Sequence, residues 1–163
     1  MKTAYFAGGC FWCITPTFQK QNGVVSVVSG YSGGMEENPS YEDVKYQRTG
    51  HRETVRIDYD AYKVSYAQLL EIFLNGVDPF DAGGQFIDRG HSYTLAVYYG
   101  CEEERLLAAA AIEKLEAASG QKVCISLEPF TAFYAAEEEH QDYYRKHPEA
   151  FRQELIESGR LKL

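Results

Sequence analysis

The stretch Thr3-Ala4-Tyr5-Phe6-Ala7-Gly8-Gly9-Cys10-Phe11-Trp12-Cys13 predicts how the fold begins. The residues Thr3–Ala7 are mostly apolar and bounded by glycine, which is typical of a short buried strand. Gly8 and Gly9 let the backbone turn sharply without a steric penalty from a Cβ atom. We therefore expect a strand, a tight turn and then a helix.

The position of Cys10 relative to this helix points to a reactive thiol. Pro16 has no amide hydrogen and is best accommodated in a first helical turn, so we expect the helix to start near Trp12 or Cys13. Cys10 then lies just before the amide-rich end of the helix, which favours a thiolate and lowers the thiol pKa. We therefore predict that Cys10 is a nucleophile.

Periodicity and turn residues predict the remaining elements. Strands are expected at Val24–Ser29, Thr54–Tyr59, Thr94–Tyr99 and Val123–Leu127. Helices are expected from the Ser65 cap to Asn75 and at Glu102–Ala118, Glu137–Lys146 and Pro148–Glu157, with irregular segments at Tyr31–Arg52 and Asp78–Ser92. The order predicts one α+β domain over residues 1–163. It is expected to be a two-layer sandwich with a ferredoxin-like β-α-β-β-α-β core, an additional helix and strand, and C-terminal helices.

Composition excludes several classes of function. The 163 residues include 24 acidic and 16 basic side chains, for a formal charge of −8, which argues against nucleic acids and anionic membranes as partners. The apolar run before Gly8 is too short for a signal peptide, and no segment approaches the roughly 20 apolar residues of a membrane span. We expect a cytoplasmic protein whose four cysteines are thiols.

Cys13 is the second thiol of a Cys-x-x-Cys pair. Residues three apart in a turn lie within about 7 Å at Cα, close to the window that a disulfide needs, so Cys13 is a candidate resolving thiol. The alternatives are two buried thiols that only pack, or half of a metal site. Neither Cys101, Cys124 nor the histidines have a companion at metal-ligand spacing, so the sequence predicts no metal and no cofactor.

A series of further motifs resembles one family in order along nearly the whole chain. After Gly9-Cys10-Phe11-Trp12 come Gly30-Tyr31-Ser32-Gly33-Gly34, Asn38-Pro39-Ser40-Tyr41, Thr49-Gly50-His51, Asp88-x-Gly90-x-x-Tyr93 and Phe133-Tyr134-x-Ala136-Glu137-x-x-His140-Gln141. Together they resemble peptide methionine sulfoxide reductase A. The resemblance implies thiol-dependent reduction of methionine-S-sulfoxide to methionine, a repair of oxidative damage.

The resemblance also assigns roles to individual residues. It implies that Cys10 attacks the sulfoxide sulfur and becomes a sulfenic acid, while Phe11 and Trp12 hold the substrate methyl group. Tyr31 and Tyr93 match phenolic donors to the sulfoxide oxygen.

The family also uses a carboxylic acid and a supporting aspartate. In this chain Asp43 falls where a glutamate is usual, and it could serve if a dry pocket raised its pKa and kept it protonated. Glu42 is the second candidate for the acid, and Asp88 matches an aspartate that supports the site.

Turnover requires the oxidised nucleophile to be reduced again. Many family members carry resolving cysteines in a glycine-rich tail, whereas this chain has no cysteine after Cys124 and a thiol at Cys13, where glycine is common. We therefore expect a Cys10–Cys13 disulfide that a thioredoxin-type reductant reopens, in a monomeric enzyme. The sequence leaves open whether free or protein-bound sulfoxide is preferred.

Two other classes of protein compete with this interpretation. A thioredoxin-like dithiol oxidoreductase also uses Cys-x-x-Cys at a helix start. Two bulky aromatics between the cysteines and two glycines ahead of them fit that class poorly. A binding module that recognises partners through Tyr31–Arg52 would show no thiol-dependent turnover.

Overall fold

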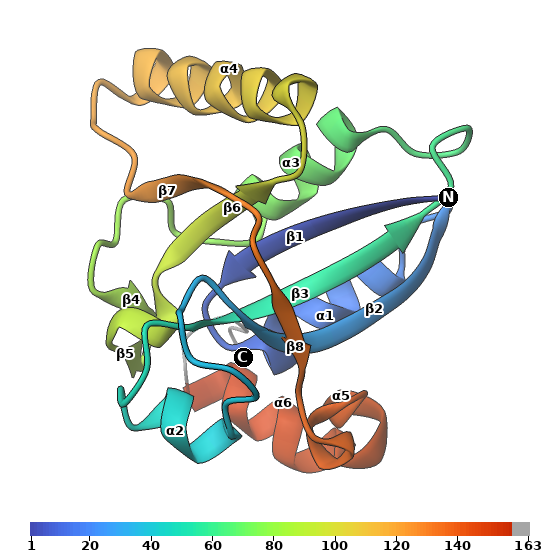
Figure 1. Ribbon diagram of the computed structural model, residues 1–163, viewed down its shortest axis with the longest axis vertical. Helices are drawn as coiled ribbons and strands as arrows, with labels where there is room; N and C mark the ends of the chain where they lie inside the picture. The colour runs from blue at the N-terminus through green and yellow to red at the C-terminus, as the bar shows by residue number, and fades with distance from the viewer. Residues whose placement is uncertain (158–163) are drawn as a thin grey trace.

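The computed structural model describes residues 1–157, which form a mixed α+β fold around a six-stranded sheet (Figure 1). The strands are β1 (Lys2–Gly8), β2 (Val24–Ser32), β3 (Arg52–Tyr59), β6 (Leu95–Tyr99), β7 (Ile125–Pro129) and β8 (Phe133–Ala135), with a separate hairpin of β4 (Gly84–Gln85) and β5 (Asp88–Arg89). The helices are α1 (Phe11–Gln19), α2 (Tyr41–Lys45), α3 (Tyr66–Asn75), α4 (Glu102–Ser119), α5 (Tyr143–Lys146) and α6 (Pro148–Glu157). Single 3₁₀ turns occupy His91–Tyr93 and Glu138–His140. The predicted α+β class is confirmed.

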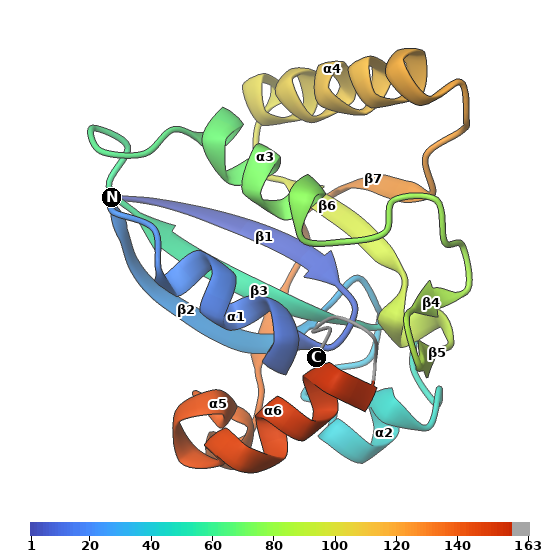
Figure 2. The same cartoon turned by 180° about the vertical axis from the view of Figure 1, so that it is seen from behind.

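The strands of the main sheet follow the order β7-β6-β1-β3-β2-β8. The neighbours from β6 to β8 pair antiparallel, and only β6 and β7 run parallel. Helices α1 and α3 lie against one face of the sheet, as Figure 2 shows from behind. The main core fills the space between: the ring centroid of Phe6 on β1 lies 5.8 Å from that of Phe18 on α1 and 5.0 Å from that of Phe73 on α3.

Several predicted helix ends are confirmed by local hydrogen bonds. The Ser65 hydroxyl accepts a bond from the Gln68 amide, and the Gln68 side chain accepts one from the Ser65 amide, so a full capping box starts α3. Helix α3 ends at Asn75 and α4 ends before Gly120, whose φ of 70° is left-handed.

Helix α1 begins earlier than predicted. It starts at Phe11, and Pro16 lies in its second turn, not its first. The helix continues through Pro16, although proline has no amide hydrogen to donate. One turn earlier, the Thr15 hydroxyl donates to the Phe11 carbonyl at 2.6 Å. Cys10 consequently lies directly at the N-cap of the helix.

Two other predicted segments were wrong in part. The segment Tyr31–Arg52 was expected to be irregular but contains α2, because the Ser40 hydroxyl caps the Asp43 amide at 3.1 Å. The predicted helix Glu137–Lys146 is broken into a 3₁₀ turn and α5, since Asp142 takes a left-handed backbone with φ of 52°. The break turns the chain so that α5 and α6 pack against α1 (Figure 2).

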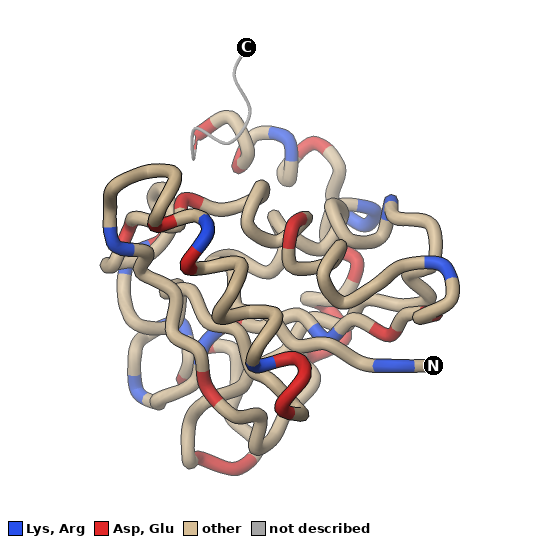
Figure 3. The backbone as a smooth tube through the Cα atoms, turned by 90° about the horizontal axis from the view of Figure 1, so that it is seen from above, with Lys and Arg blue, Asp and Glu red and all other residues tan. Residues whose placement is uncertain are grey.

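Charges are spread along the chain. In Figure 3 the lysines and arginines are separated by acidic and uncharged segments over the trace. Within residues 1–157, no helix has the length and apolar character needed to cross a bilayer.

Candidate active site

The turn between β1 and α1 places Cys10 at the centre of the candidate site. Gly9 has a φ of 86°, a conformation that favours glycine, and it lets the chain reverse between the strand and the helix. Cys10 is the N-cap of α1 and only 4% of its surface is exposed. Its carbonyl accepts the Cys13 amide at 3.1 Å, which starts the first helical turn.

Cys13 lies one turn along the helix, next to Cys10. Both cysteines are free thiols, and both are buried. Their sulfur atoms, together with a carboxylate oxygen of Glu154 on α6, all lie within 4.8 Å of one another. The structure therefore brings together the two thiols that the sequence paired.

The expectation of a lowered Cys10 pKa is wrong for this state of the protein. The hydrogen bond with Cys13 raises the pKa of the Cys10 thiol well above its usual range, and burial and the nearby Glu53 and Glu154 add to this. These effects outweigh the helix end. Cys10 is thus a neutral thiol at rest, donating towards Glu154 Oε1 at 3.9 Å.

A buried carboxyl that the sequence analysis did not single out faces this turn. Glu53 is the second residue of β3 and is 1% exposed. Its Oε1 accepts the backbone amide of Phe11 at 3.1 Å, directly beside Cys10 in the chain. Burial raises the pKa of the Glu53 carboxyl well above its usual range, which favours its protonated form.

Two tyrosines and an aspartate share this environment. Burial raises the pKa of Tyr93, with further contributions from Glu53, Tyr41, Asp88 and Cys10. The pKa of Tyr41 is raised by burial and then by Glu53, Cys10 and other nearby acids. Cys10 and Glu53 therefore contribute to the electrostatic environment of both tyrosines.

Aromatic rings form one wall of the site. Trp12 stacks on Tyr143 at 4.1 Å between ring centroids and on Tyr41 at 5.9 Å. His140 stacks on Tyr41 at 4.0 Å and on Trp12 at 5.7 Å, and Phe11 is fully buried. Among the described residues, the indole N–H of Trp12 has no hydrogen-bond partner.

The structure corrects the predicted position of the acid. Asp43 lies on α2 with 44% of its side chain exposed and pairs with Arg48 at 3.4 Å. The hydrogen bond from Ser40 lowers the pKa of Asp43, with Arg48 contributing, so it is ionised and not a proton donor. Glu42, the second candidate, is exposed. Neither residue occupies the dry pocket that the hypothesis required.

Tyr31 is also placed differently from the prediction. Its ring is fully buried next to Phe11, but its hydroxyl donates to Glu137 Oε1 at 3.0 Å. Glu137 Oε2 accepts the backbone amide of Tyr41 at 3.1 Å. Tyr31 therefore helps to fix the start of α2. Cys10 contributes to the raised pKa of Tyr41 but not to that of Tyr31, so Tyr41 is the better candidate for a donor beside Cys10.

The sequence contains a signal for Glu53. Side chains alternate along a strand, and Glu53 is in phase with the buried Val55, Ile57 and Tyr59. Burying an acid at a core-facing strand position costs free energy, so such a residue is a candidate for a functional role. The alternation of side chains along the strand alone identifies Glu53 in this way. The signal for Tyr41 is its place in the motif Asn38-Pro39-Ser40-Tyr41.

The other two cysteines lie outside the site. Cys101 is the exposed N-cap of α4, and Cys124 lies in the turn before β7 with its sulfur 3.6 Å from the Phe80 carbonyl. Neither belongs to the group formed by Cys10, Cys13 and Glu154.

Fold and site together define a class of protein. The site has two thiols at the start of a helix, a buried carboxyl with a raised pKa and two tyrosines. This combination is typical of a thiol-based oxidoreductase, in which the thiols supply electrons and the acid groups supply protons or hydrogen bonds.

The comparisons with known proteins give the family. Residues 2–163 match the family described as peptide methionine sulfoxide reductase. The chain is 48% identical over 159 residues to the peptide methionine sulfoxide reductase MsrA of Bacillus licheniformis, covering 96% of this chain and 88% of that protein. The chain belongs to this family, and the prediction of an oxidoreductase of this kind is confirmed.

Solved structures agree with the fold. Mxr1 from Saccharomyces cerevisiae in its reduced form has a TM-score of 0.85 at 28% identity, covering 91% of this chain and 86% of that one. Mxr1 in complex with Trx2 has a TM-score of 0.58 at 19% identity, covering 87% of this chain and 84% of that one.

Proposed function

We propose that this protein reduces methionine-S-sulfoxide, free or in proteins, at Cys10 and recycles through a Cys10–Cys13 disulfide. The observation that carries the proposal is the position of the Cys10 thiol at the α1 N-cap beside the buried Glu53, which accepts the Phe11 amide and whose pKa is raised by burial. The S epimer is the substrate that the family resemblance implies.

In the first step Cys10 attacks the sulfoxide sulfur. Glu53 donates its proton to the sulfoxide oxygen, with Tyr41 and Tyr93 as hydrogen-bond donors to the same atom. Trp12 and Phe11 provide the apolar surface for the methyl group, and Asp88 supports the donors. The oxygen passes to Cys10 as a sulfenic acid, and methionine leaves.

Protonation of the substrate also resolves the problem of the neutral Cys10 thiol. A protonated sulfoxide carries positive charge on its sulfur, and a positive charge beside a thiol favours the thiolate. We infer that Cys10 ionises only when substrate occupies the site and that its proton passes to the carboxylate left on Glu53, since the hydrogen bond with Cys13 and burial raise the Cys10 pKa in the free protein.

In the second step Cys13 attacks the sulfenic acid. A disulfide forms, and the hydroxyl group and the Cys13 proton leave as water. The two sulfurs start within 4.8 Å, whereas a disulfide needs about 2.05 Å, so a shift of roughly 3 Å or less completes the bond.

A thioredoxin-type dithiol protein then reduces the disulfide by thiol–disulfide exchange. The solved complex of the related Mxr1 with Trx2 supports this class of reductant. We further propose that the enzyme is a cytoplasmic monomer. We also infer that β1-α1-β2-β3-α3-β6, with strand order β6-β1-β3-β2, is its ferredoxin-like core, in which the α1 N-terminus holds the site.

Mass spectrometry after a single turnover tests the proposal. The reduced protein is given methionine sulfoxide without a reductant, digested, and its thiols are mapped. We expect one equivalent of methionine and a disulfide joining Cys10 to Cys13. Cys10→Ser should form no methionine, and Cys13→Ser should form one equivalent but fail to cycle with thioredoxin. Cys124→Ser is the matched control and should cycle normally.

A disulfide that includes Cys101 or Cys124 would refute the assignment of the resolving thiol. Methionine formation by Cys10→Ser would refute the nucleophile.

A further inference from the structure

Helix α6 brings a carboxylate to the dithiol that the catalytic cycle does not use. Glu154 is half-buried on the last turns of α6, and its Oε1 lies 3.9 Å from the sulfur of Cys10. One ligand atom each from Cys10, Cys13 and Glu154 lies within 4.8 Å of the other two. Three potential metal ligands from opposite ends of the chain therefore converge at one point.

The separations are close to those of a zinc site. Zinc binds cysteine sulfur at about 2.3 Å and carboxylate oxygen at about 2.0–2.2 Å, which places tetrahedral ligand atoms roughly 3.5–3.8 Å apart. Since the observed upper limit is 4.8 Å, a contraction of about 1.3 Å or less would bring all three onto one ion. The Cys-x-x-Cys spacing is also that of the cysteine pairs in many zinc sites.

We propose that reduced Cys10, Cys13 and Glu154 form a binding site for a thiophilic divalent cation, with Zn²⁺ as the ion of best fit. Two thiolates and a carboxylate suit Zn²⁺ better than Mg²⁺, Ca²⁺ or Mn²⁺, which prefer oxygen ligands. Three protein ligands leave a fourth position for water. Binding exchanges the protons of the two thiols for the metal, the protons pass to solvent, and no electron is transferred.

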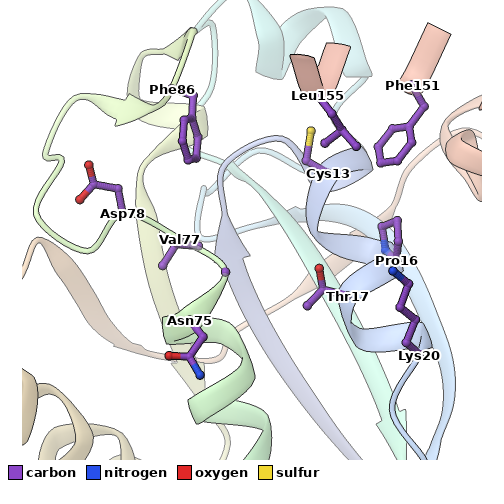
Figure 4. A pocket seen from close by; sticks show the side chains of 11 residues that line it. Cys13, Pro16, Thr17, Lys20, Asn75, Val77, Asp78, Phe86, Phe151 and Leu155 are labelled. Carbon is purple, nitrogen blue, oxygen red and sulfur yellow. The ribbon is translucent and has the colours of Figure 1, made fainter. Parts of the chain in front are cut away.

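The site has a route to solvent. Cys13 lines a cavity of about 430 Å³ together with Phe86, Phe151 and Leu155 (Figure 4). Phe151 and Leu155 belong to α6, the same helix that carries Glu154. An ion and its remaining water could therefore reach the dithiol from this cavity.

Metal binding and catalysis would exclude each other. A cation on Cys10 occupies the electron pair that attacks the sulfoxide, so the loaded protein is inactive. Oxidation to the Cys10–Cys13 disulfide removes two of the three ligands and releases the ion. The inference does not require the proposed disulfide to form during turnover, because it concerns the reduced dithiol alone.

Binding of Zn²⁺ alone to the full chain, reduced and freed of small thiols under nitrogen, tests the inference. Competition with a chromophoric chelator should give one bound Zn²⁺ per chain. Glu154→Gln should weaken binding at least ~10-fold, since even residues that only orient metal ligands are worth 10–100-fold. Glu149→Gln, an exposed residue of the same helix, makes the same charge change and should leave the affinity unchanged.

Two further measurements separate this site from other thiols. Co²⁺ in place of Zn²⁺ should give the thiolate-to-metal absorption and the intense visible bands of a tetrahedral sulfur site. Oxidation of the wild-type chain with diamide, a thiol oxidant, should abolish both, and this arm needs no variant that could fail to fold. Cys13→Ser should likewise abolish tight binding while Cys101 and Cys124 remain.

The inference is overturned if Glu154→Gln binds Zn²⁺ as tightly as Glu149→Gln. It is equally overturned if the Cys13→Ser protein or the diamide-oxidised protein retains the wild-type affinity, because the ion would then be held elsewhere.

Discussion

The Oε1 atom of Glu53 accepts the backbone amide of Phe11 at 3.1 Å, which joins the second residue of β3 to the first residue of α1. Cys10 immediately precedes that amide, so the bond fixes a carboxyl beside the proposed nucleophile. Burial raises the pKa of the carboxyl even though it sits at a helix N-terminus, where a negative charge is otherwise favoured. Desolvation is therefore the larger effect, and it suits Glu53 to the proposed role of acid.

The first prediction concerns this acid. Glu53→Gln keeps an oxygen to accept the Phe11 amide but has no proton to give, so the rate of methionine formation should fall roughly 10²–10⁴-fold. Asp43→Asn is the control, and because Asp43 is exposed and paired with Arg48 it should react at the wild-type rate. Single-turnover quench experiments measure both. If Asp43→Asn were the slow variant, the acid would be on α2 after all.

A second prediction links Glu53 to stability. The folded protein holds the Glu53 proton at pH values where the unfolded chain has lost it, because the pKa is raised above its ordinary value of 4.5. The contribution of Glu53 to the free energy of unfolding is thus fully present below about pH 4.5 and falls as the pH rises towards the raised pKa.

Glu53→Gln lacks this proton and should gain stability relative to the wild type as the pH rises through that range. Urea unfolding of both proteins at several pH values, with Glu42→Gln as an exposed control, gives the difference. A gap between the two proteins that stays constant with pH would show that Glu53 is not protonated in the fold.

The sequence predicted the elements of the site better than its chemistry. The turn at Gly8 and Gly9, the helix cap at Ser65 and the pairing of Cys10 with Cys13 follow from short-range rules, and the structure confirms their placement. The state of a proton depends on burial and on neighbours distant in sequence. Local reasoning therefore misjudged the Cys10 pKa.

The choice of acid failed for a related reason. The place of Asp43 within a motif predicts that it is the acid. The exposure of its side chain is instead set by the short helix that Ser40 caps. Glu53 could have been found from strand alternation. Glu154 could not, because only the packing of α6 against α1 brings it to the cysteines.

A third prediction distinguishes the two tyrosines. Tyr41→Phe removes a proposed donor to the sulfoxide oxygen and should lower kcat roughly 10–100-fold, since a hydrogen bond to a charged group is worth about 1.5–3 kcal/mol. Tyr31→Phe removes only the bond to Glu137. It should cost about 0.5–1.5 kcal/mol of stability and leave kcat near the wild-type value. Steady-state kinetics and urea unfolding test both variants, and a larger loss of kcat in Tyr31→Phe would restore the original assignment.

The fourth prediction concerns the aromatic wall. Trp12 stacks on Tyr143 at 4.1 Å and follows Cys10 by two residues at the start of α1. Trp12→Ala should lower kcat/KM roughly 10–100-fold, because losing the burial of a large apolar group costs about 1.5–3 kcal/mol. Trp12→Phe keeps a ring for both the methyl group and Tyr143 and should recover most of that loss. The pair is compared with dimethyl sulfoxide as well as methionine sulfoxide, since both carry the methyl group on sulfur. If Trp12→Ala weakened neither reaction, the methyl group would have to bind elsewhere than against this wall.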